Sequence, residues 1–488
     1  MTNSPSGRYA QDPFPVSGPV DILAFIPHSL GFVPHESLVL MTMDSSRLGA
    51  TLRLDLPAPA VDYSDFAVRV TELLRSDGSA NGVLMAMYTH RKWKKPGFPP
   101  HRRLIDQLGR HLSEAGLPIR DGWLVSDSTW REYFCTDSAC CPWPGHSLGQ
   151  ITDSTLSAEM VFQGSAYARS LEEAVGCDLP REWASAEDAA RHRTLYTRRL
   201  TGRWCRRSQF ACTLAFWEAL WNGAAPEEPG GSERPPAGKG CPQLRTDPEA
   251  AGFLLASLHA RPVRDTLLVM AALGSGAALD GAEACGLLSD QEGAPLLPPN
   301  SGQAHAWPAP DGGSPDYGPG TAADPGRRAV PAAVPGTASE PGPRTVPTPG
   351  PGRGGGLRRN APSDPGQDFR DVLVGAYAGV PDWAGMDAAF AVFSELLAAA
   401  SGGGTDGAHV DREAAAALLS LLAWVEWARG RGSRARVYLS RCLEGYPGYR
   451  LAELLDELLA TGMFPVWARN AETAWRSAPE QNPGTARA

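Results

Sequence analysis

The sequence lacks any apolar stretch approaching the roughly 20 residues that a membrane-spanning helix needs. It also lacks a basic start followed by an unbroken apolar segment, which is the pattern of a secretory signal peptide. We therefore expect a cytoplasmic protein without a membrane partner. Lysine occurs only at Lys92, Lys94, Lys95 and Lys239, and the net charge is −9. This balance argues against a global positive field that would hold nucleic acid.

No glycine-rich phosphate loop of the form GxGxxG or GxxxxGK[ST] occurs near a strand-to-helix junction, so nucleotide binding has little support. Two local basic clusters remain, at residues 90–103 and 191–207. The first interleaves Trp93 and Phe98 with cationic side chains, a composition that contacts phosphates and stacks on bases. Because the whole chain is acidic, solvated surface is the favoured interpretation of both clusters, and a nucleic-acid partner is not expected.

Composition and periodicity divide the chain into six predicted regions. The two interruptions are rich in Pro and Gly and have too little apolar surface to offset the entropy of ordering. The predicted regions are a disordered N-terminus (1–20), a mixed α/β domain with a cysteine-rich turn (21–156), a helical region (157–285) with a flexible insert near 222–247, a disordered Pro/Gly-rich linker (286–368), a helical domain (369–467) and a disordered tail (468–488).

The first domain alternates strand and helix patterns. Short apolar or alternating runs predict strands at 37–43, 51–56, 82–89, 123–125 and 130–134. Apolar residues at helical spacing predict helices at 63–74 and 104–112. The order ββαβαββ implies a mixed α/β sheet covered by helices.

The C-terminal zone carries a strong helical pattern. Small and large apolar residues followed by Pro447 make it similar to the second half of a tetratricopeptide repeat, although an ordinary helical bundle is the alternative. Leu439 is expected inside the resulting hairpin, and Trp424 and Trp427, on adjoining faces, are candidate interaction residues. The residues that carry the pattern are Leu418, Leu421, Leu422, Val425, Ala435, Tyr438, Leu439 and Cys442.

Three cysteines lie in the segment CTDSACCPWPG, residues 135–145. A structural zinc site needs about four N/S ligands, usually from two C-x(2–4)-C knuckles. Cys135, Cys140 and Cys141 supply one loop and no matching second knuckle, and His146 is the candidate for a fourth ligand. Three interpretations stay open: a metal site, redox or disulfide chemistry, and buried thiols that anchor the Pro-rich turn. The last is favoured, so no cofactor is predicted and substoichiometric zinc is expected.

A cysteine nucleophile would need a base such as His28, His35 or His146 beside it. No signature of a cysteine hydrolase surrounds these thiols. The nine cysteines are odd in number and scattered, which favours reduced thiols or metal ligands over a disulfide framework.

Three segments carry a resemblance to a known family. They are DILAFIPHSLGFVPHESLVLMTM (21–43), WREYFCTDSACCPWPG (130–145) and AWVEWARGRGSRARVYLSRCLEGYPGY (423–449). With these motifs, and with Arg264-Asp265 in ARPVRDTLL, the chain resembles the actinobacterial family catalogued as domain of unknown function 4192. The resemblance implies an α/β opening, a cysteine element and a helical end, and it implies no reaction.

The sequence therefore predicts a cytosolic protein whose leading function class is a non-enzymatic interaction or regulatory protein with a protein partner. The alternative is an enzyme or small-ligand-binding domain that uses the cysteine loop, and a nucleic-acid-binding module comes third. The oligomeric state is not predicted.

Overall fold

The computed structural model describes residues 18–91, 98–177, 185–224, 242–296, 364–401 and 411–476, apart from residues 46, 61, 292 and 471, together with Trp93 and Trp183. Most of the predicted insert, of the Pro/Gly-rich linker and of both predicted disordered ends lies outside the described residues, as do the three lysines of the first basic cluster. Where the structure describes these segments, parts of them are helical, within the helices Pro19–Leu30, Pro242–Thr246 and Pro365–Val374 and the 3-10 turn Val466–Arg469. The predicted disorder and flexibility are wrong at these positions.

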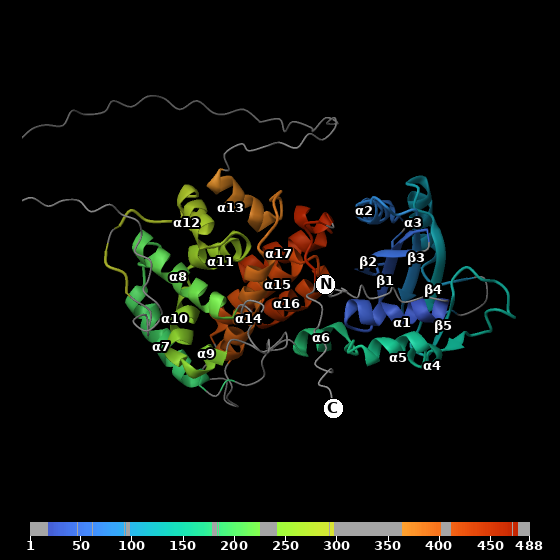
Figure 1. The fold of residues 1–488 in the computed structure, drawn as a ribbon, viewed down its shortest axis with the longest axis horizontal. Helices are drawn as coiled ribbons and strands as arrows, with labels where there is room; N and C mark the ends of the chain where they lie inside the picture. The colour runs from blue at the N-terminus through green and yellow to red at the C-terminus, as the bar shows by residue number, and fades with distance from the viewer. Residues whose placement is uncertain are drawn as a thin grey trace, which may run out of the picture. The chain divides into compact units, whose positions relative to one another are not determined.

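The N-terminal part is a six-stranded mixed sheet with helices on both faces (Figure 1). Its elements are α1 (Pro19–Leu30), β1 (Ser37–Asp44), β2 (Arg47–Asp55), α2 (Ser64–Leu74), β3 (Gly82–Tyr88), α3 (Arg102–Glu114), β4 (Ile119–Val125), β5 (Thr129–Glu132), β6 (His146–Ser147), α4 (Gly149–Thr152) and α5 (Thr155–Phe162).

The strand order is β2-β1-β3-β4-β5-β6. Only β3 and β4 are parallel, with α3 as the connection between them, and the other neighbouring pairs are antiparallel. All seven residues of β3 are buried, as expected for a central strand covered on both faces. The predicted mixed α/β sheet and its ββαβαββ order are confirmed.

Alternating side chains of β1 and β3 divide between two hydrophobic clusters. Leu38, Leu40, Val83 and Met85 face α2 and α3, whose apolar residues recur at helical spacing. The opposite set, which includes Val39 and Leu84, lies in a separate cluster with α1 residues and with Trp123 of β4. The alternation of side chains along each strand thus supplies apolar residues to the clusters on both faces of the sheet.

Three elements of this part were not predicted: α1, β6 and the four-residue helix α4. The Pro-containing sequence of α1 has its only internal proline, Pro27, in the last turn, and the helix ends at Gly31 with φ +78°, a left-handed conformation that glycine adopts without strain. Strand β6 has two residues, which is too short for any periodicity.

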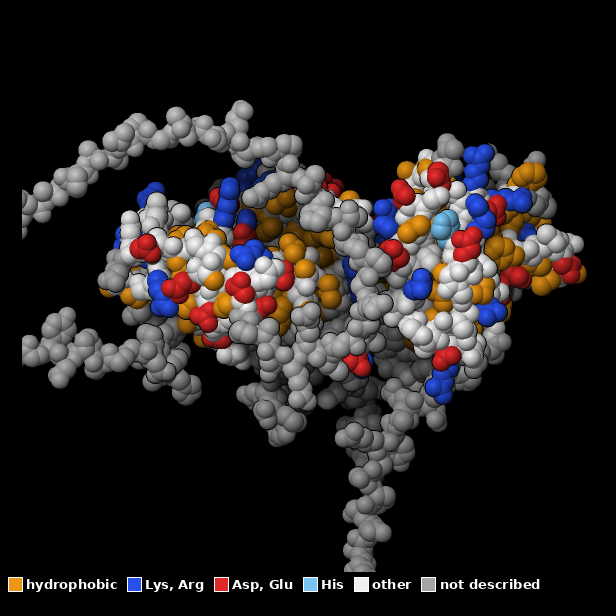
Figure 2. Space-filling view, turned by 90° about the horizontal axis from the view of Figure 1, so that it is seen from above, with side chains coloured by type: hydrophobic (Ala, Val, Ile, Leu, Met, Phe, Trp, Pro, Cys, Tyr) orange, Lys and Arg blue, Asp and Glu red, His pale blue; other side chains and the backbone are white. Residues whose placement is uncertain are grey.

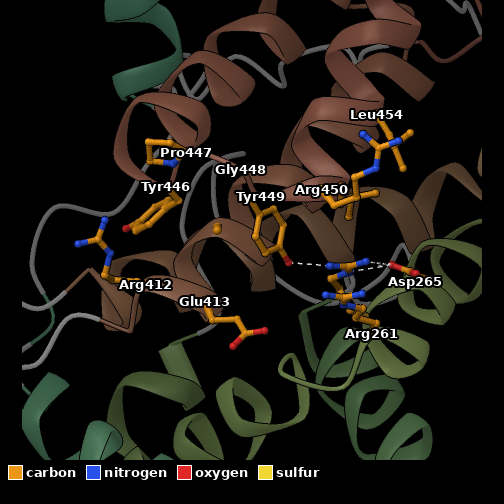
Figure 3. A pocket seen from close by; sticks show the side chains of 13 residues that line it. Arg261, Asp265, Arg412, Glu413, Tyr446, Pro447, Gly448, Tyr449, Arg450 and Leu454 are labelled. Carbon is orange, nitrogen blue, oxygen red and sulfur yellow. Dashed lines mark hydrogen bonds and ion pairs between the residues drawn. The ribbon is translucent and has the colours of Figure 1, made fainter.

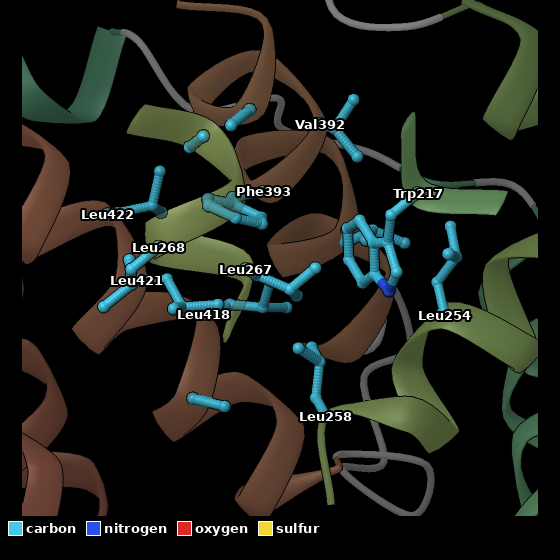
Figure 4. Packing of buried hydrophobic residues seen from close by; sticks show 14 of the residues in the cluster. Trp217, Leu254, Leu258, Leu267, Leu268, Val392, Phe393, Leu418, Leu421 and Leu422 are labelled. Carbon is cyan, nitrogen blue, oxygen red and sulfur yellow. The ribbon is translucent and has the colours of Figure 1, made fainter. Parts of the chain in front are cut away.

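The C-terminal part is helical and has one hydrophobic core, seen in Figure 4. Its helices are α6 (Leu171–Cys177), α7 (Ala186–Leu200), α8 (Arg207–Ala224), α9 (Pro242–Thr246), α10 (Pro248–Ser257), α11 (Arg261–Leu273), α12 (Ser275–Ala284), α13 (Pro365–Val374), α14 (Trp383–Ala400), α15 (Arg412–Ala428), α16 (Gly432–Gly445), α17 (Arg450–Ala460) and the 3-10 turn Val466–Arg469.

This core joins the two helical regions that the sequence separates. Trp217 of α8 and Phe393 of α14 are fully buried with ring centroids 5.8 Å apart, and the Trp217 indole N–H donates to Ser257 Oγ at 3.1 Å. Helices on both sides of the gap between 296 and 364 therefore complete each other's apolar faces.

The hairpin of α15 and α16 is at the centre of this part. Leu439 is fully buried in the same cluster as Val425 and Leu455, which confirms its predicted place. Among the described helices, Trp383–Ala400 is long and apolar enough to cross a membrane, but most of it is buried in the core, as in a core helix of a soluble protein.

Basic and acidic side chains are interspersed on the face of the molecule shown in Figure 2. On this face no large area carries charge of a single sign. Such a mixed surface fits the modest net charge of the sequence.

Candidate metal centre

The cysteine loop connects β5 to β6 at the edge of the sheet. Strand β5 ends at Glu132, and the chain then turns through Asp137. The Asp137 carbonyl oxygen accepts from the Cys141 backbone N–H at 2.8 Å, and its carboxylate accepts from the Ala139 N–H at 2.8 Å. These bonds close a tight turn that folds Cys140 and Cys141 back toward Cys135.

The turn brings four candidate ligand atoms together. The Sγ atoms of Cys135, Cys140 and Cys141 and a carboxylate oxygen of Glu132 all lie within 4.8 Å of one another. In a tetrahedral zinc site with Zn–S bonds of about 2.3 Å, the sulfur atoms stand roughly 3.8 Å apart. A contraction of about 1 Å at most would therefore place all four donors around one ion.

Sequence reasoning named the three thiols correctly as a group but missed Glu132. The segment from Glu132 to Cys135 has the spacing E-x2-C, which is the spacing of a zinc knuckle with a carboxylate in place of the first thiolate. A search for cysteine and histidine alone does not find it. The fourth donor thus comes from the end of the strand that precedes the loop.

His146, the predicted fourth ligand, is not part of the cluster. It lies on β6 and stacks on Trp130 with ring centroids 4.7 Å apart. The other two histidines considered as bases also have partners elsewhere: His28 Nδ1 lies 2.9 Å from Ser165 Oγ, and His35 Nε2 lies 3.4 Å from the Arg169 carbonyl oxygen. The cysteine loop therefore has no histidine base among these three.

The expected burial of all three thiols is not observed. Cys141 is buried, Cys135 is half-buried and Cys140 is exposed. An exposed thiol anchors no turn by packing, so the predicted packing role does not fit Cys140, and this leaves the ligand and redox interpretations for that thiol.

The thiols shift one another's protonation. Burial raises the pKa of Cys141 to about 12, and the neighbouring thiols Cys135 and Cys140 add to the rise. For Cys140, the hydrogen bond with Cys141 lowers the pKa, but hydrogen bonding and charge from Cys135 raise it further, so the net direction is upward. Crowded thiolates repel, and a bound cation would reverse this effect.

A cationic group lies beside the loop. Arg131 is buried, with its guanidinium 4.6 Å from the Trp93 ring centroid and 5.2 Å from that of Trp143, and it donates to the Cys141 carbonyl oxygen at 3.4 Å. Three thiolates and one carboxylate around a divalent ion carry a formal charge of about −2. Arg131 is placed to offset part of that charge.

The candidate interaction residues Trp424 and Trp427 lie in the helical core. They are 1% and 2% exposed, and their indole N–H groups donate to the carbonyl oxygens of Leu373 and Met463 at 3.0 and 2.9 Å. On adjoining faces of α15, both rings pack against neighbouring segments of the chain. Both rings therefore pack inside the helical core, and neither candidate interaction residue is exposed.

Comparison with known proteins gives one match. No curated protein and no solved structure matches the chain. The family model described as Domain of unknown function (DUF4192) matches residues 19–284 and 384–466, which include the sheet, the cysteine loop and most of the helical core. The chain belongs to this family of domain of unknown function DUF4192.

Proposed function

We propose that this protein is a zinc-binding protein of the interaction or regulatory type, with Cys135, Cys140, Cys141 and Glu132 as the ligands. The observation that carries the proposal is the convergence of three Sγ atoms and one carboxylate oxygen within 4.8 Å. Thiolates favour zinc, copper(I) or iron–sulfur clusters, and a single tetrahedral set of four donors fits zinc best.

The number of protein donors supports a structural role for the ion. Catalytic zinc sites keep three protein ligands and leave one position for water or substrate, whereas structural sites are closed. Here Glu132 at the end of β5 and the three thiols of the loop would together fill the tetrahedron. The ion would hold the turn between β5 and β6, and its binding free energy would be part of the folding free energy of that loop.

Elemental analysis of the full chain, purified without chelator or affinity metal, tests the proposal. We expect about one zinc per chain, and less than about 0.2 in the Cys140→Ser variant, because removing a ligand costs most of the affinity. Glu132→Gln should reduce the zinc content less, since a carboxylate is a weaker partner for zinc than a thiolate. Two matched controls should keep full zinc: Cys205→Ser, a half-buried thiol outside the cluster, and His146→Ala.

Two results would contradict the proposal. One is substoichiometric zinc in wild-type protein supplied with excess zinc. The other is a cobalt-substituted protein without the intense thiolate-to-cobalt absorption of a tetrahedral site. If His146→Ala lost zinc while Glu132→Gln kept it, the ligand set predicted from the sequence would replace the one proposed here.

The interaction class extends to the helical part. We infer that the hairpin of α15 and α16 with α17 is tetratricopeptide-like and serves a protein partner. The support is the small-to-large alternation of Ala435, Tyr438 and Leu439, all fully buried, followed by Pro447. An experimental structure tests this inference, because α15 and α16 should cross at the angle of the antiparallel helices in tetratricopeptide repeats, and a different crossing angle would contradict it.

The seven described cysteines are unpaired, which fits the reducing, cytoplasmic location that we propose for the protein.

A further inference from the structure

A second site candidate lies in the helical part, far in sequence from the cysteine loop. A cavity of about 570 Å³ opens between the start of α11, the start of α15 and the connection from α16 to α17. Its volume falls within the roughly 300–1,000 Å³ of small-molecule pockets. In Figure 3, Arg412 and Tyr446 lie on one side, Arg261, Asp265 and Arg450 on the other, and Tyr449 and Glu413 between them.

Three of the lining arginines occupy the first position of a helix. Arg261 begins α11, Arg412 begins α15 and Arg450 begins α17. A cation is unfavourable there, because the N-terminus of a helix already carries a partial positive charge. At this cavity three helices each begin with an unfavourably placed cation. Several local departures from favourable sequence choices at one place are expected at a functional site.

Two of these helix ends also lack a side-chain cap. The N-cap residues are Ala260 for α11 and Tyr449 for α17, and neither accepts a backbone N–H through its side chain. Helix α15 differs, because the Asp411 carboxylate accepts from the Ala414 N–H at 3.1 Å. Uncapped N–H groups and arginines at the same ends together favour an anion.

A fourth arginine is fixed at the centre of the site. Arg264 has a side chain only 9% exposed, and the Asp265 carboxylate accepts from its Nε at 2.7 Å and from its NH2 group at 2.6 Å. Its NH1 group donates to the Tyr449 hydroxyl oxygen at 2.7 Å. A guanidinium has five N–H donors, so two remain for a ligand, and the Tyr449 O–H can donate as well.

The carboxylates of the cavity are already paired. Asp265 is held by Arg264, and Glu413 lies 3.5 Å from His259 Nδ1. Arg261 forms no hydrogen bond or ion pair with a residue in the described part of the chain, although its charge partly opposes the rise that burial causes in the pKa of Asp265. Of the four lining arginines, Arg450 is paired with Glu453 at 3.4 Å and with Glu457 at 4.0 Å, and Arg264 is paired with Asp265. Arg261 and Arg412 are the two lining arginines that form no ion pair within the described part of the chain, and they carry the positive charge offered to a ligand.

We propose that this cavity binds a phosphorylated small molecule, with its phosphoryl oxygens on Arg261, Arg264 and Arg412. A phosphoryl group offers three or more acceptor oxygens, which suits donors that converge from separate helices, whereas a carboxylate offers two. The apolar side chains of Pro447, Leu451 and Leu454 also line the cavity. They would contact the body of the ligand.

Calorimetric titration of the full chain tests the proposal, with inorganic pyrophosphate and ADP as probes. We expect saturable binding at one site for both. The Arg261→Gln/Arg412→Gln double variant should weaken it at least about tenfold, because each lost guanidinium removes charge-assisted hydrogen bonds. The matched control is Arg191→Gln, an exposed arginine on α7 outside the cavity, which should bind like wild type. Thermal midpoints of all variants confirm that they fold.

The outcomes separate cleanly. Tighter binding of ADP than of pyrophosphate, reduced by Leu451→Ser, would support contact with the ligand body, and equal affinity would support recognition of the phosphoryl groups alone. Tyr449→Phe keeps the ring and should weaken both probes several-fold. The proposal is overturned by the absence of saturable binding, by unchanged affinity in the double variant, or by citrate binding as tightly as pyrophosphate.

Discussion

The sheet part and the helical part use the same residue type in opposite ways. In the sheet part three thiols gather on one surface loop, with Cys140 exposed and a carboxylate beside them. In the helical part Cys212 and Cys442 are buried and lie outside that group, and Cys442 contacts Ser420 and the Ala416 carbonyl oxygen. Burial raises the pKa of Cys442 to about 11, which keeps it a neutral, inert thiol. The role of a cysteine thus depends on the side chains around it more than on the number of cysteines in the chain.

The largest expected effect isolates the helical part. Leu439→Ala should lower the free energy of unfolding by about 2–5 kcal/mol, because the side chain is fully buried and its removal leaves a cavity. Urea denaturation measures the change. The matched control is Leu454→Ala, which should cost less than about 0.5 kcal/mol because Leu454 is 44% exposed. If the two regions are independent in chemistry, both variants keep full zinc. Zinc loss in Leu439→Ala would break the comparison.

The second prediction isolates the sheet part through pH. Because the pKa values of Cys140 and Cys141 are raised, both thiols are protonated at neutral pH and must release protons to bind zinc. Lower pH therefore weakens binding. Between pH 8 and pH 6 we expect the apparent zinc affinity to fall about 100-fold per pH unit from these two thiols, or about 2.7 kcal/mol per unit. Competition with a chromophoric chelator measures it, and a flat profile would contradict thiolate ligation.

The third prediction exchanges one cysteine in each part. Cys442→Ser should destabilise the chain by about 1–2 kcal/mol without changing zinc content, because it places a more polar group in a site where the thiol contacts Ser420 and the Ala416 carbonyl oxygen. Cys140→Ser should show the opposite pattern. Its zinc content should fall, whereas its free energy of unfolding, compared with that of wild type in the presence of chelator, should change little because the residue is exposed. If both variants changed stability and zinc content in the same way, the proposed difference between the cysteines of the two parts would be wrong.

The sequence predicted the sheet more fully than the site. Strands such as 82–89 and helices such as 104–112 follow from local periodicity, which a single sequence records directly. The two-residue strand β6 and the single core shared by Trp217 and Phe393 depend on contacts between distant segments. Periodicity carries no information on which helices meet.

The candidate metal centre shows the same limit at the scale of one loop. The thiols were visible as a motif, but the choice of Glu132 over His146 depends on how the chain leaves β5, and on His146 being paired with Trp130 across the sheet. The arginine cavity was less visible still. Its members come from helices separated by about 150 residues of chain, and only Arg264-Asp265 stood out in the sequence.

The smallest expected effect concerns an ion pair behind that cavity. His259 Nε2 lies 2.9 Å from Asp411 Oδ2, and Glu413 and Arg193 also face this pair. The hydrogen bond to Asp411 raises the pKa of His259 above its ordinary value, against the effect of burial. Burial alone would raise the pKa of Asp411, but the bond and charge of His259 hold it below its usual range.

The signs of these shifts define a pH window. A raised histidine pKa contributes stability that is fully present below about pH 6.5 and is lost as the pH rises through the folded-state pKa. A lowered aspartate pKa contributes stability above about pH 4 that is lost as the pH falls further. The pair therefore stabilises the helical part most near pH 5–6. From pH 6 to pH 8 the free energy of unfolding of the wild type should fall, as measured by urea denaturation. His259→Asn should show a flatter profile, and so should Asp411→Asn, which keeps the helix cap. Parallel profiles for all three proteins would show that this pair does not titrate with folding.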